Sequence, residues 1–264
     1  MFDVAFMRVA LLASVAAAAP LAVVGVYLVV KRVVFLGLVL ANAAAVGIVV
    51  APLLGWTPEL AAVSVTLGTS IVLGMLPVPR RVPAESIIGW AYAAASSAIV
   101  LILAGAATGD ADTLHLLYGN VLAVSPGHAA GLAVIAGVIG VVQIAFGARF
   151  MLVTFDAEAA EVAGVNTRLW ATGLNLTIGI AAATAVHEIG ALLTFSLLTL
   201  PAMAALLVAR RIRTTFAASA AIGVIAVWAG LVVAFRLDLP PGPLSVGVLV
   251  IAVAAAAGVG RWRG

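Results

Sequence analysis

Two neighbouring ionisable residues, His187 and Glu188, stand in a stretch of residues 169–209 that contains no other charged side chain and no other histidine. An imidazole beside a carboxylate suits a divalent transition metal or a proton. If the stretch lies in a membrane, such a pair is costly and most often functional. The alternative is that the pair lies at the outer interface, where water reaches it, and the nearby Gly190 fits that position. The sequence makes the pair a candidate for the metal or substrate path and leaves the alternative open.

A few other polar residues could also meet a substrate. Asn42 is a lone polar residue in an apolar stretch and is a second candidate for the path, although such an amide more often bonds across helices. The loop 107–127 contains a moderately apolar part, DTLHLLYGNVLAVS, which is either a short gate-like helix or a surface helix. Its gate candidates are His115, Tyr118 and Asn120, while His115 and His128 themselves are expected to be solvated.

The segment 154–166, TFDAEAAEVAGVN, is polar and lies between two basic residues. Asp156 can cap a short alanine-rich helix, and Gly164 followed by Asn166 can end it. A short helix between two membrane spans is suited to docking on a partner. A linker helix with a solvated acidic face is the alternative, and composition alone slightly favours it.

Motifs for nucleotide binding or hydrolysis are absent from the sequence. There is no GxxxxGK phosphate loop, no HExxH zinc helix and no evident Ser-His-Asp order, so we expect no catalytic residues and no cofactor bound by this chain. ATP-driven transport would need a separate ATPase that holds ATP and Mg²⁺. The lack of cysteine excludes thiolate metal sites, and the lack of a basic run with aromatics argues against nucleic acid as a partner.

The composition identifies the elements that must position these residues. Hydrophobic residues make up 65% of the 264, charged residues only 9%, and the mean hydropathy is +1.29. A soluble domain is about a quarter charged, so the chain is predicted to be an all-α, polytopic membrane helix bundle within membrane lipid. Strands are not expected, because the apolar runs are too long for a membrane barrel. We expect one transmembrane domain over residues 1–264.

Nine apolar segments approach the roughly 20 residues that a membrane helix needs. The first resembles a signal peptide but is long enough to span, and we expect it to be a retained helix. The sixth and seventh have almost no loop between them, so one could be short or re-entrant, and eight or nine transmembrane helices are predicted. The segments are 6–30, 34–54, 58–77, 86–106, 128–152, 168–187, 190–209, 215–235 and 243–260.

The basic residues predict the orientation of these spans. With nine spans and the N-terminus outside, only Arg8 and Arg236 face outward, which is a strong positive-inside bias. The acidic residues Asp110 and Asp112 then lie outside. A different number of spans would reverse part of this map. The residues on the cytoplasmic side are Lys31, Arg32, Arg80, Arg81, Arg149, Arg168, Arg210, Arg211, Arg213, Arg261 and Arg263.

Four collinear stretches resemble the permeases of metal-type ABC importers: FDAEAAEVAGVNTRLW, IGALLTFSLLTLPAMAALLVARRIR, LVVAFRLDLPPGPLSVGVLV and LLYGNVLAVSPG. The prolines and glycine at Pro201, Pro240, Gly242 and Pro243 make the resemblance specific. It implies a type II importer-like permease in a prokaryotic cytoplasmic (inner) membrane. It also implies a dimer with a second copy or a homologue, two ABC ATPase subunits and an extracytoplasmic metal-binding protein.

The resemblance also implies a role for 154–166, because in that family this segment is the cytoplasmic coupling helix that docks on the ATPase. The resemblance therefore favours docking over the linker alternative. The coupling residues that it implies are Phe155, Asp156, Ala157, Glu158, Ala160, Gly164, Val165 and Asn166.

The second span departs from the family pattern. Where that family usually has an aspartate and a histidine, KRVVFLGLVLANAAAVG has Leu38 and Asn42. Leucine cannot ligate a metal, and an asparagine amide is a weak ligand. Three explanations are open: the ligands have moved to His187 and Glu188, the metal travels as a chelate, or a partner permease supplies the ligands.

The function predicted from the sequence is a permease subunit that imports a divalent transition metal, such as zinc, manganese or iron, by alternating access. One rival is a permease for a metal chelate or another small solute. A second rival is a secondary transporter, which would need no ATPase and would move its substrate alone along an ion gradient.

Overall fold

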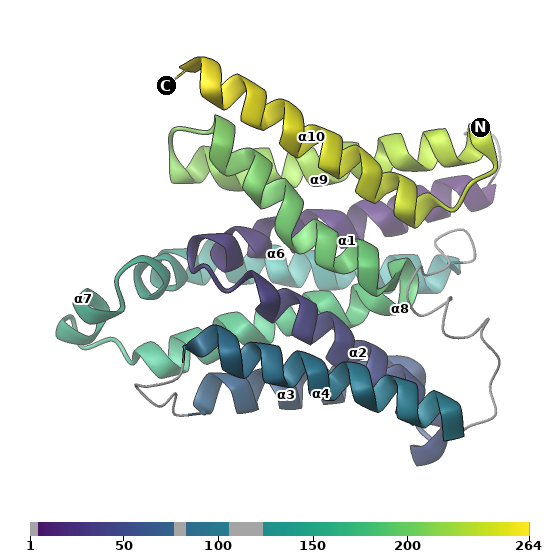
Figure 1. Ribbon diagram of the computed structural model, residues 1–264, viewed down its shortest axis with the longest axis horizontal. Coiled ribbons are helices and arrows are strands. Elements are labelled where there is room, and N and C mark those ends of the chain that lie inside the picture. Colours follow the sequence, from purple (N-terminus) through teal and green to yellow (C-terminus); the bar gives the residue numbers. More distant parts are fainter. Residues whose placement is uncertain (1–4, 77–82, 106–123, 264) are drawn as a thin grey trace.

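The computed structural model describes residues 5–76, 83–105 and 124–263, and in these ranges it is helical with no strand (Figure 1). The predicted all-α membrane bundle is confirmed. The long helices begin and end within a few residues of the predicted spans. They are α1 (Ala5–Val30), α2 (Val34–Leu54), α3 (Pro58–Met75), α4 (Ala84–Gly105), α6 (Pro126–Phe155), α8 (Thr167–Val208), α9 (Ile212–Leu237) and α10 (Pro241–Arg263), with the short α7 (Ala157–Val162) between α6 and α8.

Eight of the described helices are long and apolar enough to cross a membrane, but α8 contains two of the predicted spans. Its backbone leaves helical geometry at Gly190, with φ 80° and ψ 160°. Figure 1 shows α8 running away from α7, turning at this break and running back. Leu174 of the first limb lines a cavity with Tyr27 and Leu28 of α1, and the backbone of Leu198 of the second limb lies against Gly25 of α1, so both limbs reach the same end of α1. The described helices therefore provide nine crossings.

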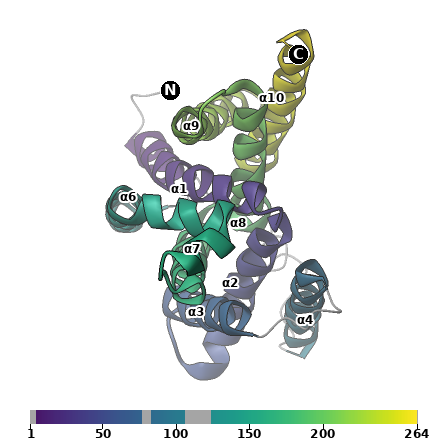
Figure 2. The ribbon, with the colours of Figure 1, turned by 90° about the vertical axis from the view of Figure 1, so that its left-hand side faces the viewer.

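The two limbs of α8 form the centre of the bundle. They pack against α1, α2, α3 and α10, and α1 packs in turn against α9. Close packing depends on small residues: a Cβ at Gly25 of α1 would overlap the backbone carbonyl of Leu198. In lipid, where apolar surface has little tendency to associate, such close backbone contact is a main source of helix association. Figure 2 shows α4 at the edge of the bundle, beside α2.

The two ends of the bundle differ in charge. The turn from α1 to α2, with Lys31 and Arg32, and the junction of α8 with α9, at Arg210, lie at the same end as α7 (Figure 1). The positive-inside rule assigns this end to the cytoplasm and the start of α1 to the outside. The expected gate-like helix of the loop 107–127 falls mostly on residues that the structure does not describe, as do Arg80, Arg81, Asp110 and Asp112.

Candidate functional site

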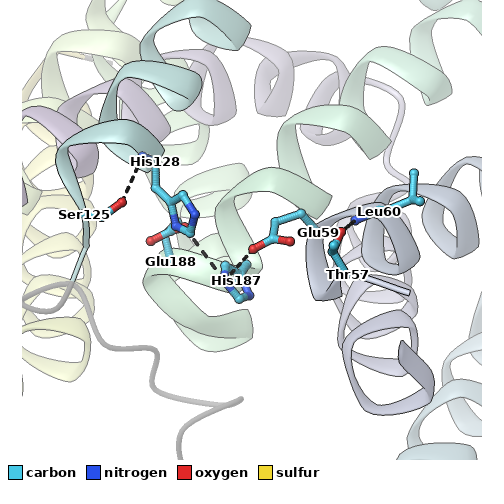
Figure 3. A network of polar contacts seen from close by, with 7 residues as sticks. All are labelled: Thr57, Glu59, Leu60, Ser125, His128, His187 and Glu188. Atoms are coloured by element: carbon cyan, nitrogen blue, oxygen red, sulfur yellow. Dashed lines mark hydrogen bonds and ion pairs between the residues drawn. The ribbon is translucent and has the colours of Figure 1, made fainter. Parts of the chain in front are cut away.

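Four ionisable side chains from three helices meet at the outer end of the bundle (Figure 3). Glu59 is in the first turn of α3, His128 is in the first turn of α6, and His187 and Glu188 precede the break in α8. We call these four residues the outer cluster. Each comes from the end of a helix rather than its middle, so the cluster lies near the membrane surface.

Two capped helix starts fix the positions of Glu59 and His128. The Thr57 hydroxyl accepts a hydrogen bond from the Leu60 amide at 3.4 Å, and the Ser125 hydroxyl accepts one from the His128 amide at 3.2 Å. In both helices a proline follows the cap, which suits the first helical position because its missing N–H would be unpaired there anyway. The carboxylate of Glu59 is also favoured at a helix N-terminus by the helix dipole.

The break at Gly190 fixes the other two residues. A φ of 80° with ψ of 160° belongs to a region that only glycine enters readily. The Gly190 carbonyl accepts a hydrogen bond from the Thr194 hydroxyl at 2.7 Å, which joins the turn to the second limb. The first limb therefore ends abruptly, with His187 and Glu188 at its tip.

The outer cluster consists of two histidine–carboxylate pairs that touch each other. His128 Nδ1 lies 3.0 Å from Glu188 Oε1, and His187 Nε2 lies 3.3 Å from Glu59 Oε1. The pairs are linked by a 4.0 Å approach of His187 Nε2 to Glu188 Oε1 and by imidazole rings whose centroids are 6.0 Å apart. Figure 3 shows all four side chains directed toward one another.

Burial is unequal within the outer cluster. The side chain of Glu188 is only 10% exposed, whereas those of Glu59 and His128 are about half exposed and that of His187 is 27% exposed. One carboxylate is thus held inside the bundle while three possible ligands face the outer side. The ligand atoms of Glu59, His128 and His187 all lie within 4.8 Å of one another. Two imidazoles and a carboxylate are a donor set that binds divalent transition metals.

The structure answers some of the sequence-based expectations about this end. His187 and Glu188 stand just before the break in α8, and each lies beside an ionisable side chain of another helix. His128 is half exposed, yet it is ion-paired. Glu59 was missed by sequence analysis; its one signal was the Thr57–Pro58–Glu59 helix start. The gate candidates His115, Tyr118 and Asn120 lie outside the described residues.

Asn42 is not part of the outer cluster. Its amide donates to the Leu38 carbonyl of its own helix at 3.0 Å, so the expectation of a bond to another helix was wrong for the described residues. Leu38 and Asn42 are one helical turn apart on a partly exposed face of α2. That face presents no ionised ligand at these two positions.

A cavity of about 200 Å³ opens at the cytoplasmic end, between α1, α2, α3, α4 and α8. Its lining is mostly apolar, and its one basic residue is Lys31. Burial lowers the pKa of the Lys31 ammonium from its ordinary value. The described residues that line this cavity include no carboxylate and no imidazole, which are the usual protein ligands of divalent metals.

The short cytoplasmic helix forms as the local signals predict. Asp156 Oδ1 accepts a hydrogen bond from the Ala159 amide at 2.8 Å, and Gly164 ends the helix with φ 76°. The helix is shorter than the predicted segment, because α6 continues to Phe155 and Asn166 instead caps α8 through the Leu169 amide. The helix α7 therefore follows α6 after the single residue Asp156 and is joined to α8 by the four residues 163–166.

The exposed surface of α7 is partly apolar. Val162 is 90% exposed and Phe155, just before the helix, is 58% exposed. By contrast Ala160 is fully buried against the bundle, although the sequence placed it among the docking residues. The cytoplasmic tip thus presents apolar side chains outward, and Val162 is the residue that sequence analysis missed.

Contacts of Phe146, Arg149 and Phe150 of α6 with Trp170, which we call the clasp, hold α6 to the first limb of α8 near α7. The Arg149 guanidinium lies 4.8 Å from the centre of the Trp170 ring. Phe146 and Phe150 of α6 also pack on Trp170, with ring centroids 5.6 and 5.7 Å away. These two helices are therefore fixed to each other at the cytoplasmic end by the clasp and meet again at the outer end, where His128 pairs with Glu188.

Comparison with known proteins shows which family shares this sequence and which solved structure shares this fold. The family model described as the ABC 3 transport family matches residues 3–259. The manganese transport system membrane protein MntC of Halalkalibacterium halodurans is 26% identical over 240 residues, which cover 90% of this chain and 81% of the relative. The chelated iron transport system membrane protein YfeD of Yersinia pestis is 25% identical over 242 residues, covering 92% and 81%. The solved structure of PsaBC from Streptococcus pneumoniae in complex with Fab contains a chain of the same fold, with a TM-score of 0.85 and 19% sequence identity. The superposition covers 96% of this chain and 91% of the PsaBC chain.

Proposed function

We propose that this chain, which belongs to the ABC 3 transport family, is the membrane permease subunit of an ATP-driven importer for a divalent transition metal. The observation that carries the proposal is the continuous family match over residues 3–259, joined to relatives named as manganese and chelated-iron transport proteins. The relatives match over more than four fifths of their own length, so the likeness extends to the whole membrane domain. The outer cluster supports a cation as cargo.

The partners in this proposal follow from what the chain lacks. It has no phosphate-binding loop, so ATP and Mg²⁺ belong to a separate ATPase subunit. The assembly would contain two permease subunits, two ATPases and an extracytoplasmic metal-binding protein that docks at the outer end, in the cytoplasmic membrane of a prokaryote. The basic residues near α7 support a cytoplasmic position for the ATPase.

Coupling in this proposal passes through α7. The helix links α6 to α8, and its exposed Val162 and neighbouring Phe155 suit an apolar pocket on the ATPase. A push on α7 would be transmitted along both helices, because α-helices are stiff and the first limb of α8 is roughly 30–35 Å long. Both helices end in residues of the outer cluster, so a cytoplasmic push would move the outer mouth.

The test is metal uptake by proteoliposomes that contain the permease and its ATPase, with radioactive Zn²⁺ and Mn²⁺ as probes. Val162→Asp should reduce ATP-dependent uptake by on the order of tenfold or more, because a charge in an apolar contact costs over 1.4 kcal/mol. The matched control Val162→Ala should retain most of the uptake. Normal ATP-dependent uptake by a correctly inserted Val162→Asp protein would refute the coupling role. Uptake by the permease alone, driven by an ion gradient, would refute the ATP-driven importer.

A further inference from the structure

We propose that Glu59, His128 and His187 bind the incoming divalent transition metal at the outer mouth, and that Glu188 orients His128 for this purpose. The inference deepens the proposed function and rests on it only for the identity of the ion as cargo. Binding itself depends on the four side chains. The chain would thus take its ion at the tips of α3, α6 and α8, and not at Leu38 and Asn42 of α2.

The distances already approach those of a metal complex. Ligand atoms of a tetrahedral zinc site with bonds of about 2.0–2.1 Å are about 3.3–3.4 Å apart. The separation of Glu59 Oε1 from His187 Nε2 is 3.3 Å, and no pair among the three ligand atoms exceeds 4.8 Å. The Glu59–His187 pair thus already has the spacing of a metal complex, and side-chain torsions can bring the imidazole of His128 toward it.

Glu188 has the properties of a residue that supports a ligand. It is the most buried of the four, and its Oε1 lies 3.0 Å from His128 Nδ1. When the Nδ1 hydrogen is donated to a carboxylate, the Nε2 lone pair remains free for a metal and the ring is held in one orientation. Metal-bound histidines have such a partner in most proteins, and its loss typically weakens metal affinity 10- to 100-fold.

The arrangement suits capture and release rather than permanent binding. Structural zinc sites are closed by four protein ligands, whereas this one offers three and leaves a position open. Glu59 and His128 are half exposed on the outer side, so the fourth position can be filled by water or by a group of a delivering protein. Two imidazoles select transition metals over Mg²⁺ and Ca²⁺, which prefer oxygen ligands.

Two of the three ligands stand on helices that α7 joins, and the third stands on a helix that it does not join. His128 is at the outer end of α6 and His187 at the outer end of the first limb of α8, and α7 joins the cytoplasmic ends of these helices. Glu59 belongs to α3, which α7 does not join. A shift of about 1 Å between α3 and the other two helices would lengthen metal bonds of about 2 Å beyond coordination. Movement of α7 is therefore suited to releasing the ion from the cluster.

The test measures metal binding to the purified full-length permease, with Zn²⁺ by calorimetry and with Co²⁺ by its visible absorption. The wild-type chain should bind one ion with the intense absorption of tetrahedral Co²⁺. His187→Ala and Glu59→Gln should each weaken binding by at least tenfold. Glu188→Gln should weaken it about 10- to 100-fold while keeping the tetrahedral spectrum, because Glu188 is not a ligand. The control Glu85→Gln, in the first turn of α4 at the opposite end, should bind like wild type.

Each outcome decides one of the two proposals. Unchanged Zn²⁺ affinity in His187→Ala, with the same metal-free thermal stability as wild type, would overturn the binding site. His187→Asp, which restores a ligand, should recover part of the affinity; no recovery would also count against the site. If the variants lose binding but the wild-type complex with its ATPase transports no metal, the site stands and the proposed function fails. If the wild-type complex transports Zn²⁺ and His187→Ala transports it with an unchanged KM, the function stands and the entry site fails.

Discussion

Replacement of Gly190 by alanine tests the turn on which the outer cluster depends. At φ 80° and ψ 160° an L-residue is strained, and such conformations cost about 1–3 kcal/mol each. We expect Gly190→Ala either to lower the stability of the folded chain by about 1–3 kcal/mol or to relax the turn and displace His187 and Glu188.

The control for this substitution is Gly137→Ala in α6. A Cβ at Gly137 meets nothing within 4 Å, and Gly137 lies inside a regular helix. There alanine should be neutral or stabilising by up to about 1 kcal/mol. The comparison therefore isolates the backbone conformation at Gly190 from the general effect of a glycine-to-alanine change.

Two measurements on the same samples check the expectation. Denaturant unfolding in detergent followed by circular dichroism gives the change in stability, and Zn²⁺ calorimetry gives the change in affinity. A stable protein with weakened Zn²⁺ binding would indicate a relaxed turn, and a destabilised protein with normal binding would indicate a strained one. Wild-type stability together with wild-type Zn²⁺ affinity would refute the argument that Gly190 positions the cluster.

Two further predictions concern the cytoplasmic clasp and the second helix. Trp170→Ala should destabilise the chain by about 2–4 kcal/mol, because the cation–π contact and the ring packing are lost. It should reduce ATP-dependent uptake but leave the Zn²⁺ affinity, measured by calorimetry, within twofold of wild type. Equal losses of uptake and affinity would show that the clasp supports the outer cluster as well. Asn42→Leu should leave Zn²⁺ affinity and metal uptake unchanged, because its amide bonds its own helix at the Leu38 carbonyl. Lost uptake in Asn42→Leu would place the path on α2.

The spans and α7 could be predicted because their signals are local. The thickness of lipid sets helix length at roughly 20 residues, so apolar runs alone placed α2 at 34–54. Asp156 and Gly164 mark the ends of α7 through hydrogen bonds and a left-handed backbone that depend on neighbouring residues. The exposure of Val162 could not be predicted, since an apolar residue in a short helix faces inward or outward according to how the helix sits on the bundle.

The outer cluster could be predicted only in part, because its contacts join distant residues. His187 and Glu188 stood out as charges in an apolar stretch. Glu59 lies 128 positions from His187 in the chain, and their pairing depends on α8 reversing beside the start of α3. The sequence predicted a boundary between the spans 168–187 and 190–209 but left open whether one of them is short or re-entrant, because almost no loop separates them. His128 was expected to be solvated because a histidine beside a polar loop gives no sign of its partner.

The position of the cluster also follows from the cost of charge in a membrane. A carboxylate at the centre of a span costs at least about 2.5 kcal/mol, whereas one at a helix start is favoured by the dipole and by water. Leu38 avoids the first cost, and Glu59 carries its charge at a helix start. Glu188 stands at the C-terminal end of the first limb of α8, where the dipole does not favour a carboxylate, and lies 3.0 Å from the imidazole of His128. A cation held at the centre would also need to leave a deep site, while a cation held at the tips of α3, α6 and α8 leaves when those tips separate. In the proposed importer, transport would be controlled chiefly at the outer mouth, and the affinity of that mouth for metal should fall when α7 is displaced by the ATPase.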